Sequence, residues 1–483
     1  MHFTVVQKVV GGLLMLFSIT TVPPLIVSAI YGDPAAGAFV ESGLLMAVAG
    51  LAVWFPVRNV RWPLRLREGF LVTAMFWTVL GMAAGLPLML AHASSLSFTD
   101  ATFESISGFT TTGSTVMTGL DSLPRSLQFY RQELQWLGGM GIIVLAVAIL
   151  PMLGIGGMQL YRAEVPGPVK DAKLTPRITE TAKALWYLYL GLTVLCALAF
   201  WLGGMSLFDA IGHSFSTLST GGYSPYDASF GHFDSPLLEA IAIVFMMLGG
   251  ANFGLHFVAL RRRTVAHYAQ DAEFRTYIGI LAGFSLITAV YLWIGHAYSG
   301  VFPDLLEGTF QVVSVMTTTG FTTASFAHWP AFIPVLLMFS SIIGGCASST
   351  GGGLKVIRVL LLFKQGRREL KRLVHPNALV PVKIGGTTLD NRVVDGIWGF
   401  FSTYALCYVV SMLLLMAAGL DQVSAFSAVA ATINNMGPGL GSVAANFQSL
   451  GDFSKWVLII DMLLGRLEVF TVLVLLTPDF WRS

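Results

Sequence analysis

The sequence predicts an all-α membrane protein with ten transmembrane helices and four re-entrant pore helices. Of the 483 residues, 55% are hydrophobic and only 11% are charged, and the mean hydropathy is +0.72. This composition leaves too little polar surface to cover a soluble globule. In addition, a short polar motif ending in glycine occurs four times. We therefore expect four quasi-symmetric repeats around one pore, plus an extra N-terminal helix pair.

Ten apolar stretches are long enough, or nearly so, to cross about 30 Å of hydrocarbon. They cover approximately residues 9–30, 39–55, 70–90, 136–153, 185–202, 237–260, 277–294, 332–363, 397–420 and 456–476. The first stretch could be misread as a cleaved secretory signal, but it is too long and a second span follows almost at once. We therefore assign residues 1–67 to the extra transmembrane pair.

Positive charge is distributed unevenly between the two sides of these spans. If the N-terminus starts inside, all but four of the 28 Lys and Arg residues fall on the inner side. The inner residues include Arg58, Arg61, Arg65, Arg67, those from Arg162 to Lys183, Arg261 to Arg263, and those from Lys355 to Arg392. The exceptions are Arg125, Arg131, Lys455 and Arg466. Because cytoplasmic loops are enriched in Lys and Arg, we expect both termini in the cytoplasm.

The four polar motifs set the length of the repeat. They are Thr110-Thr111-Thr112-Gly113, Ser219-Thr220-Gly221-Gly222, Thr317-Thr318-Thr319-Gly320 and Asn434-Asn435-Met436-Gly437. Thirteen residues before each last glycine stand Asp100, Asp209, Glu307 and Ser424, and another glycine follows at Gly138, Gly249, Gly344 and Gly465. The spacing predicts repeats over residues 68–165, 166–270, 271–375 and 376–483.

The apolar segments before the motifs are about a dozen residues long, which suits a helix that crosses half a membrane. They cover residues 98–109, 207–218, 305–316 and 423–433. Asp100 and Asp209 lie where a carboxylate interacts favourably with a helix N-terminus. The polar strands that follow must be buried in protein or line a watery cavity. We therefore expect the four strands to share a central axis.

This arrangement suits a monovalent cation. Extended strands can surround a dehydrated ion with backbone carbonyl oxygens, and glycine reaches backbone angles that a Cβ would obstruct. The C-terminal ends of the short helices would also favour a cation. No acidic residue lies in the motifs, which argues against a divalent ion. The alternative is that the motifs are ordinary turns, where Thr and Gly are common; four copies in register favour a filter.

The four motifs, the extra N-terminal pair and the segment Gly465-Arg466-Leu467-Glu468 resemble the Trk/Ktr/HKT superfamily of potassium transporters, specifically its TrkH-type bacterial subunit. The resemblance covers essentially the whole chain. It implies K⁺-channel-like repeats and K⁺ uptake across the bacterial inner membrane. It also implies a homodimer, embedded in the lipid bilayer and controlled by a cytosolic TrkA-type subunit that binds ATP, ADP or NAD. Because the motifs are shorter than a channel filter and asymmetric, we expect Rb⁺ and some Na⁺ to pass.

One predicted span contains a glycine-rich interruption, Gly344-Gly345-Cys346-Ala347-Ser348-Ser349-Thr350-Gly351-Gly352-Gly353. Each interior glycine costs roughly 1 kcal/mol relative to alanine, so the helix should break there. In the family the corresponding loop is a gate, and the resemblance implies the same role here. The alternative is close helix packing by small residues. The segment is a poor phosphate loop, because no Ser or Thr follows Lys355, and residues 154–157 are an equally poor dinucleotide fingerprint.

Arg466 lies in the last predicted span, where an arginine exposed to lipid costs at least a few kcal/mol. We expect it to lie below the filter, where it slows K⁺ or holds the gating loop. The alternative is a structural ion pair with Asp461, Glu468 or another repeat.

The remaining residues indicate neither an enzyme nor a metal centre. Histidines such as His213, His256 and His328 lack metal-ligand spacing, and no catalytic triad or HExxH pattern occurs. The three cysteines lie in apolar segments without a pairing pattern. We expect no organic cofactor and no nucleic-acid partner.

Coupled transport with H⁺ or Na⁺ stays open as an alternative to channel-like conduction. The carboxylates available for coupling are Glu104, Glu133, Asp209, Glu239 and Glu307, and the sequence places none of them at the membrane midplane. The basic run from Lys364 to Lys383 could bind anionic lipid or a regulatory partner, or serve only as a topology signal.

Overall fold

The computed structural model describes residues 2–60, 66–144, 178–298, 300–330 and 332–482. Within these ranges the chain is almost entirely helical, and the one small sheet pairs β1 (Lys383–Ile384) with β2 (Thr387–Thr388). Six helical segments of this part are long and apolar enough to cross a membrane, or seven if one bent pair counts as a span. The all-helical fold class is confirmed, whereas the count of ten spans stays a prediction. Residues 145–153 of the fourth expected span, the basic residues from Arg162 to Arg177, and residues 154–157 lie outside the described residues.

The N-terminal pair packs through small residues. It contains α1 (Phe3–Phe17), the 3-10 helix η1 (Ser18–Thr21), α2 (Val22–Tyr31), α3 (Ala36–Trp54) and the 3-10 helix η2 (Phe55–Val57). A Cβ at Gly11 would lie 2.9 Å from the Gly50 carbonyl oxygen, and one at Gly50 would lie 2.9 Å from that of Gly11. The missing side chains thus let α1 and α3 approach closely. The pair is joined to the next region by Asp33, whose carboxylate accepts bonds from the Ser126 amide and hydroxyl, both at 2.9 Å.

Four further groups of helices follow along the chain. The first contains α4 (Leu66–Met75), the π-helix η3 (Phe76–Leu80), α5 (Gly81–Ala83), α6 (Leu86–Leu90), α7 (Phe98–Phe109), the 3-10 helix η4 (Leu120–Ser122) and α8 (Arg125–Val144). The second contains α10 (Ile178–Leu202), α11 (Leu207–Leu218), the 3-10 helix η7 (Ser229–Phe233), α12 (Pro236–Gly249), α13 (Phe253–Arg262) and α14 (Ala266–Gln270). The third contains α15 (Ala272–Ile294), α16 (Val301–Met316), the 3-10 helix η8 (Phe326–His328), α17 (Phe332–Ile343) and α18 (Val356–Val374), and the small sheet follows it. The fourth contains α19 (Asn391–Ala417), α20 (Gln422–Ile433), the 3-10 helix η9 (Gly441–Val443), α21 (Asp452–Arg466), α22 (Phe470–Leu473), the 3-10 helix η10 (Val474–Leu476) and α23 (Pro478–Trp481).

Short helices precede all four polar motifs, at or close to the expected positions. Helices α7 and α11 have the expected bounds, and α20 starts one residue earlier than expected. Helix α16 was expected to begin at residue 305 but begins at Val301. Three of the four have a side-chain cap: Ser97, Ser206 and Asp421 accept hydrogen bonds from backbone amides of the first turn. These caps satisfy amides that have no partner within the helix.

Three expected spans are broken. The break predicted at the glycine-rich segment is present, because α17 ends at Ile343 and α18 begins at Val356. Two other breaks contradict the expectation of continuous spans over 237–260 and 456–476. Helices α12 and α13 meet at 97°, with Asn252 capping α13, and α21 ends at Arg466, followed by Glu468 at φ +52°.

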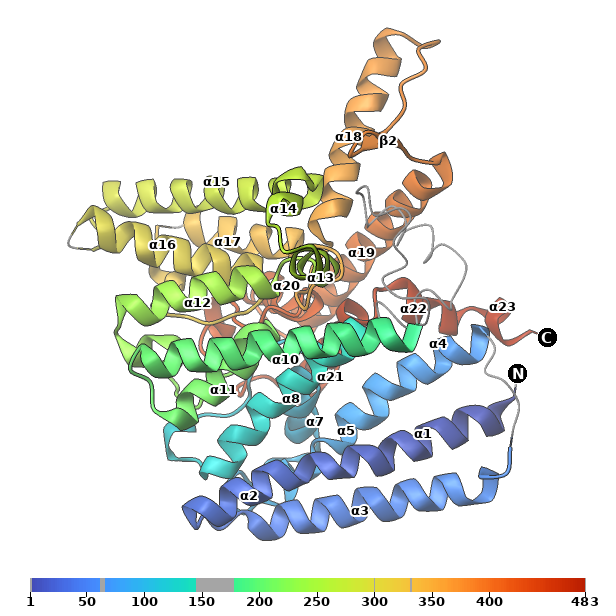
Figure 1. Ribbon diagram of the computed structural model, residues 1–483, viewed down its shortest axis with the longest axis vertical. Coiled ribbons are helices and arrows are strands. Elements are labelled where there is room, and N and C mark those ends of the chain that lie inside the picture. Colours follow the sequence, from blue (N-terminus) through green and yellow to red (C-terminus); the bar gives the residue numbers. More distant parts are fainter. Residues whose placement is uncertain (1, 61–65, 145–177, 299, 331, 483) are drawn as a thin grey trace.

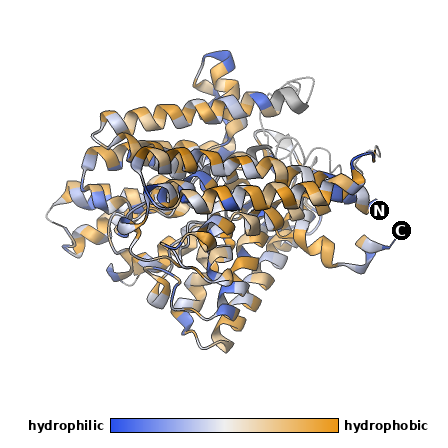
Figure 2. Cartoon of the chain, turned by 90° about the horizontal axis from the view of Figure 1, so that it is seen from below, coloured by the Kyte–Doolittle hydropathy of each residue, from blue (hydrophilic) through white to orange (hydrophobic). Residues whose placement is uncertain are grey.

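The long helices α1, α3, α10 and α15 run in roughly the same direction through the body of the molecule, with α1 and α3 packed side by side, and α18 projects away from the body (Figure 1). Hydrophobic residues predominate along the helices of the body (Figure 2). Both termini lie at the same end of the bundle (Figure 1). Arg67 of α4 donates a hydrogen bond to the Arg482 carbonyl oxygen at 2.5 Å, and Phe3 stacks on Trp481. The two ends of the described chain therefore lie close together.

Candidate functional site

The four polar motifs share one backbone conformation. The second residue of each is left-handed, at Thr111, Thr220, Thr318 and Asn435, with φ between 52° and 60°. The last glycine of each is also left-handed, with φ of 84°, 75°, 82° and 105° in chain order. Such angles are unfavourable for residues with a Cβ, so four independent recurrences indicate a required shape. The quasi-symmetry predicted from the glycine spacing therefore extends to the backbone geometry.

Each motif is anchored to its own short helix in the same way. The residue before the last glycine donates its amide to the carbonyl of the residue five positions earlier, at 2.8 Å in every case. The four bonds are Thr112 to Ser107, Gly221 to Ser216, Thr319 to Ser314 and Met436 to Ala431. The strands thus start directly from the C-terminal ends of α7, α11, α16 and α20.

The strands also meet one another in a closed ring. A Cβ atom added at Gly113 would overlap the carbonyl oxygen of Gly221 in the next strand. In the same way, a Cβ at Gly222 would overlap the carbonyl oxygen of Thr319, and a Cβ at Gly320 would overlap the carbonyl oxygen of Met436. A Cβ at Gly437 would lie 2.9 Å from the Thr112 carbonyl oxygen, which closes the ring. The first and fourth strands are also bonded directly, because the Ser114 hydroxyl donates to the Gly437 carbonyl at 2.8 Å. Glycine is needed at these positions for lateral contact as well as for its φ angle.

Behind the ring, the next helix of each group approaches the end of the short helix. A Cβ at Gly138 would overlap the Phe109 carbonyl oxygen, and one at Gly465 that of Ile433. A Cβ at Gly249 would lie 3.2 Å from the Leu218 carbonyl oxygen. Gly344, expected to be their counterpart, instead lies against Gly352 and Gly353 of its own loop. In the third group Gly351 makes the close approach, because a Cβ added there would lie 2.8 Å from the Thr317 carbonyl oxygen.

The asparagines of the fourth motif are held by bonds within their own group and by side chains of the first and third groups. Asn435 donates from Nδ2 to the Thr112 hydroxyl at 2.8 Å and to the Met462 carbonyl at 3.0 Å. Asn434 accepts from the Tyr404 hydroxyl at 2.6 Å and donates to the Ser341 hydroxyl at 3.1 Å. The departure from threonine therefore supplies bonds that a threonine could not make.

The glycine-rich loop lies against the inner ends of three motifs. The Thr350 hydroxyl donates to the carbonyls of Leu218 and Gly249, both at 3.0 Å. The Gly352 amide donates to the Thr318 hydroxyl at 2.7 Å, and a Cβ at Gly352 would overlap the Asn434 carbonyl. The loop is left-handed at Gly344, Ser348, Gly353 and Lys355. Gly345 and Ser349 also belong to the loop, and the Ser349 side chain is buried.

Arg466 joins this loop to the first group of helices. Its Nη1 donates to the Thr350 carbonyl at 2.9 Å and its Nη2 to the Gly138 carbonyl at 3.2 Å. Only 2% of its surface is exposed. Glu468 pairs with Arg358 at 2.8 Å, and Asp461 accepts from Ser411 at 2.6 Å. Among the described residues no carboxylate pairs with Arg466, so the proposed structural ion pair with either acid is wrong.

Most of the carboxylates considered for coupling contact residues that follow the last glycine of a motif. Glu104 is fully buried and pairs with Arg131, and Glu307 accepts from the Thr323 hydroxyl at 2.5 Å. Asp209 accepts from Tyr226 at 3.1 Å. Glu133 and Glu239 are buried, each with one oxygen that accepts no hydrogen bond.

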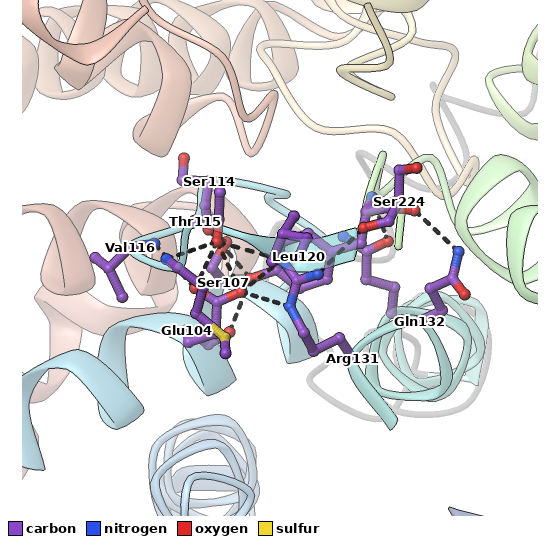
Figure 3. A network of polar contacts seen from close by, with 12 residues as sticks. Glu104, Ser107, Ser114, Thr115, Val116, Leu120, Arg131, Gln132 and Ser224 are labelled. Carbon is purple, nitrogen blue, oxygen red and sulfur yellow. Dashed lines mark hydrogen bonds and ion pairs between the residues drawn. The ribbon is translucent and has the colours of Figure 1, made fainter. Parts of the chain in front are cut away.

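A polar face of α8 was missed at the sequence level. Gln132 and Gln135 donate to the carbonyls of Tyr223 and Gly221 at 3.2 and 2.6 Å, and Arg131 donates to that of Ser224 at 3.2 Å. These side chains point at the second strand from one face of α8, as Figure 3 shows for Arg131 and Gln132. The sequence pattern that could have predicted this face is the set of polar residues at helical spacing in the first half of α8.

Comparison with known proteins decides the family. The sequence family described as TrkH, "Cation transport protein", matches residues 36–482. The chain belongs to the TrkH family. Members of this family are transporters, not enzymes.

The relatives within the TrkH family match over their whole length. The chain is 57% identical to the "Trk system potassium uptake protein TrkH" of Vibrio parahaemolyticus and 56% identical to that of Escherichia coli K12, covering 100% of both chains in each case. It is 40% identical to the "Trk system potassium uptake protein TrkG" of E. coli K12, covering 99% of that protein. The crystal structure of the potassium transporter TrkH from V. parahaemolyticus superposes with a TM-score of 0.93, at 54% identity and full coverage of both chains.

Proposed function

We propose that this protein takes up K⁺ across the bacterial inner membrane through the ring of four motifs. The observation that carries the proposal is the closed contact of each last glycine with the carbonyl of the next strand. Four strands of one conformation on a common ring can surround a dehydrated ion with backbone oxygens. The filter then consists of Thr110–Gly113, Ser219–Gly222, Thr317–Gly320 and Asn434–Gly437. Rb⁺ and some Na⁺ pass as well.

The gate of this pathway is the loop from Gly344 to Gly353, together with Arg466. The loop packs against the inner ends of the second, third and fourth motifs, and Arg466 ties it to α8. A buried guanidinium that no carboxylate of the described residues pairs with also places a positive charge near the route of a cation. Arg466→Ala is expected to raise basal flux, and unchanged transport kinetics and voltage dependence would refute this role.

Regulation comes from a cytosolic TrkA-type subunit that binds ATP, ADP or NAD and docks on the arm formed by α18. The arm projects from the bundle (Figure 1). Its basic residues lie beside exposed apolar side chains, including Leu370 at 67% and Leu373 at 80% exposure. Exposed apolar patches edged with charge suit a protein partner better than open solvent. The transporter works as a homodimer with both termini in the cytoplasm.

Uptake of ⁸⁶Rb⁺ into liposomes that contain the purified chain tests this function. Wild type is expected to accumulate Rb⁺, and Gly113→Ser and Gly320→Ser are expected to lose uptake or selectivity, because their side chains would overlap the neighbouring strand. Gly279→Ala, at a position with nothing within 4 Å, is the matched control. A folded wild type that stays silent even with a TrkA-type subunit present would overturn the proposal.

A second candidate function, symport with H⁺ or Na⁺, is favoured by one observation. Asp461 is 1% exposed, and only one of its carboxylate oxygens has a hydrogen-bond partner. It lies on α21 next to the fourth motif, and an ionisable group at such depth often marks a proton relay. A reversal potential that tracks pH in wild type but not in Asp461→Asn would support symport. A current that follows the K⁺ gradient alone would support the channel.

A further inference from the structure

A buried ion pair lies behind the first motif, on the external side of the ring. Glu104 on α7 and Arg131 on α8 are 0% and 1% exposed, and Arg131 Nη2 and Nε each lie 2.8 Å from Glu104 Oε1. Figure 3 shows the two side chains pointing toward one another among residues of the first and second strands. Burying two charges costs several kcal/mol each unless their hydrogen-bonding capacity is filled, so the other contacts of the pair matter.

Glu104 holds the first strand beyond its last glycine. Its Oε2 accepts from the Val116 amide at 3.0 Å, and both oxygens accept from the Thr115 hydroxyl at 3.0 Å. Hydrogen bonds to an ionised carboxylate are stronger than those between neutral groups. The segment directly outside Gly113 is therefore fixed to α7 by a charged group.

Arg131 extends this contact to the second strand. Its Nη1 donates to the Ser224 carbonyl at 3.2 Å, its Nη2 to the Thr115 hydroxyl at 3.3 Å, and its guanidinium lies 4.1 Å from the centre of the Tyr223 ring. Thr115 and Ser224 each stand two residues after the last glycine of their motif. One guanidinium therefore joins equivalent positions of two neighbouring strands.

The second repeat has a related but uncharged arrangement, and the others have none. The position of Glu104, nine residues before the last glycine, holds His213, Gln311 and Ala428 in the other repeats. His213 Nε2 lies 3.2 Å from the Ser224 hydroxyl, whereas both amide atoms of Gln311 are buried without a partner. In the part of the chain that the structure describes, a charged link of this kind therefore occurs only at the boundary between the first and second strands.

We propose that Glu104 and Arg131 are positioning residues that set the ion selectivity of the filter by fixing the first strand to the second. The inference rests on the proposed function, because it assumes that these strands line the K⁺ path. Neither side chain contacts the ion. Arg131 acts on the second strand through the Ser224 carbonyl, and Glu104 orients Arg131 while holding Thr115 and Val116. Loss of the link lets the two strands separate, and a wider ring discriminates less between K⁺ and Na⁺.

The test compares ⁸⁶Rb⁺ and ²²Na⁺ uptake by liposomes containing wild type, Arg131→Lys or Glu104→Gln. Lysine keeps the charge but its single ammonium cannot reach the carboxylate, Thr115 and Ser224 together. Both variants are expected to lower the Rb⁺/Na⁺ uptake ratio by about tenfold, the effect of losing a charge-assisted bond to a strand. Lys455→Gln is the matched control, because Lys455 pairs with Asp100 at the start of the same helix α7, at 2.6 Å, without touching a strand. It is expected to leave the ratio unchanged even if it lowers the unfolding temperature.

The outcomes separate this proposal from the proposed function. A folded wild type without Rb⁺ uptake, even with a TrkA-type subunit present, refutes the function. A wild type that is selective, with folded Arg131→Lys and Glu104→Gln variants of unchanged ratio, refutes the positioning role alone. An equal shift in Lys455→Gln would do the same, because it would indicate general destabilisation. If the charge variants do not fold, Thr115→Val removes only the hydroxyl between the two groups. The proposal then requires a smaller fall in the same ratio, and an unchanged ratio contradicts it.

Discussion

Glycine acts in two distinct ways at the ring of motifs, and both can be traced to single contacts. The last glycines of the motifs combine a left-handed φ with contact to the next strand. Gly138 and Gly465 are helical, and there the missing side chain lets one helix rest on the end of another. The sequence predicted these positions from spacing alone, because a required close approach leaves a repeated residue type. It mispredicted Gly344, because spacing cannot tell which glycine of a cluster makes the contact.

At the residue scale, Gly465→Ala is expected to destabilise the protein by about 1–3 kcal/mol, the range for overpacked positions. The new methyl group would overlap the Ile433 carbonyl and push α21 away from α20. Thermal unfolding in detergent, followed by size-exclusion chromatography, measures the effect. Gly279→Ala on α15, with open space around it, should instead be neutral or slightly stabilising. Equal unfolding temperatures for the two variants would show that the contact carries no strain.

Buried basic residues were the other informative residue class. Three of the four exceptions to the charge asymmetry, Arg131, Lys455 and Arg466, are at most 5% exposed. Each bonds to a short helix, a motif strand or the glycine-rich loop. The sequence alone could show that these three residues depart from the charge asymmetry and have a specific role, because a charged side chain within a membrane is costly unless it has a partner. Their partners could not be predicted, because they lie 16 to 355 residues away along the chain.

Helix breaks dominate at the scale of elements. The sequence predicts the break between α17 and α18, where five glycines cluster, but not the one between α12 and α13. There only Gly249, Gly250 and Asn252 mark it, in an otherwise apolar stretch. The physical cause is tertiary: the Cys346 amide donates to the Gly250 carbonyl at 2.8 Å, so the glycine-rich loop occupies the corner. Such a partner from another repeat is invisible to local propensity.

The bend depends on the cap of α13. Asn252 accepts from the Gly254 amide at 2.8 Å. Asn252→Ala is expected to cost about 1 kcal/mol of stability, and Asn252→Asp, which can still accept the bond, should cost less. Unfolding temperatures of the two variants measured side by side provide the check. If alanine and aspartate behave alike, the cap does not stabilise the bend.

Thr350→Val tests how the glycine-rich loop is held. The substitution is nearly isosteric but removes the hydroxyl that donates to Leu218 and Gly249. The two buried carbonyls share the single hydroxyl hydrogen, and Gly249 keeps the Thr350 amide as a donor. The loss should therefore cost about 1–3 kcal/mol in total, and the loop should leave the closed position more often. We expect a higher basal Rb⁺ flux in liposomes. Thr350→Ser, which keeps the hydroxyl, should resemble wild type, and identical flux in all three proteins would count against a gating role.

For the whole molecule, the projecting arm of α18 should matter only when a partner is present. Replacing Leu370 and Leu373 by serine removes exposed apolar surface without disturbing the buried core. We expect unchanged flux through the isolated chain and loss of the response to a TrkA-type subunit. Flux assays with and without that subunit measure both effects. An intact response in the double variant would place the docking surface elsewhere.

Composition and periodicity were sufficient for the architecture but not for its asymmetry. The positions of the short helices and motifs follow from patterns repeated four times along the chain. What could not be predicted are the features that differ between repeats, such as the Glu104–Arg131 pair or the asparagine bonds of the fourth motif. A feature present once leaves no pattern, and only the three-dimensional contacts reveal it.

The hydrogen bond from Ser114 to Gly437 joins residues 323 positions apart. During synthesis the first strand therefore lacks its contact with the fourth strand until almost the entire polypeptide has been made. Contacts of such sequence separation form late and slowly. A chain that ends before the fourth strand therefore lacks the neighbour that closes the ring of motifs against the first strand.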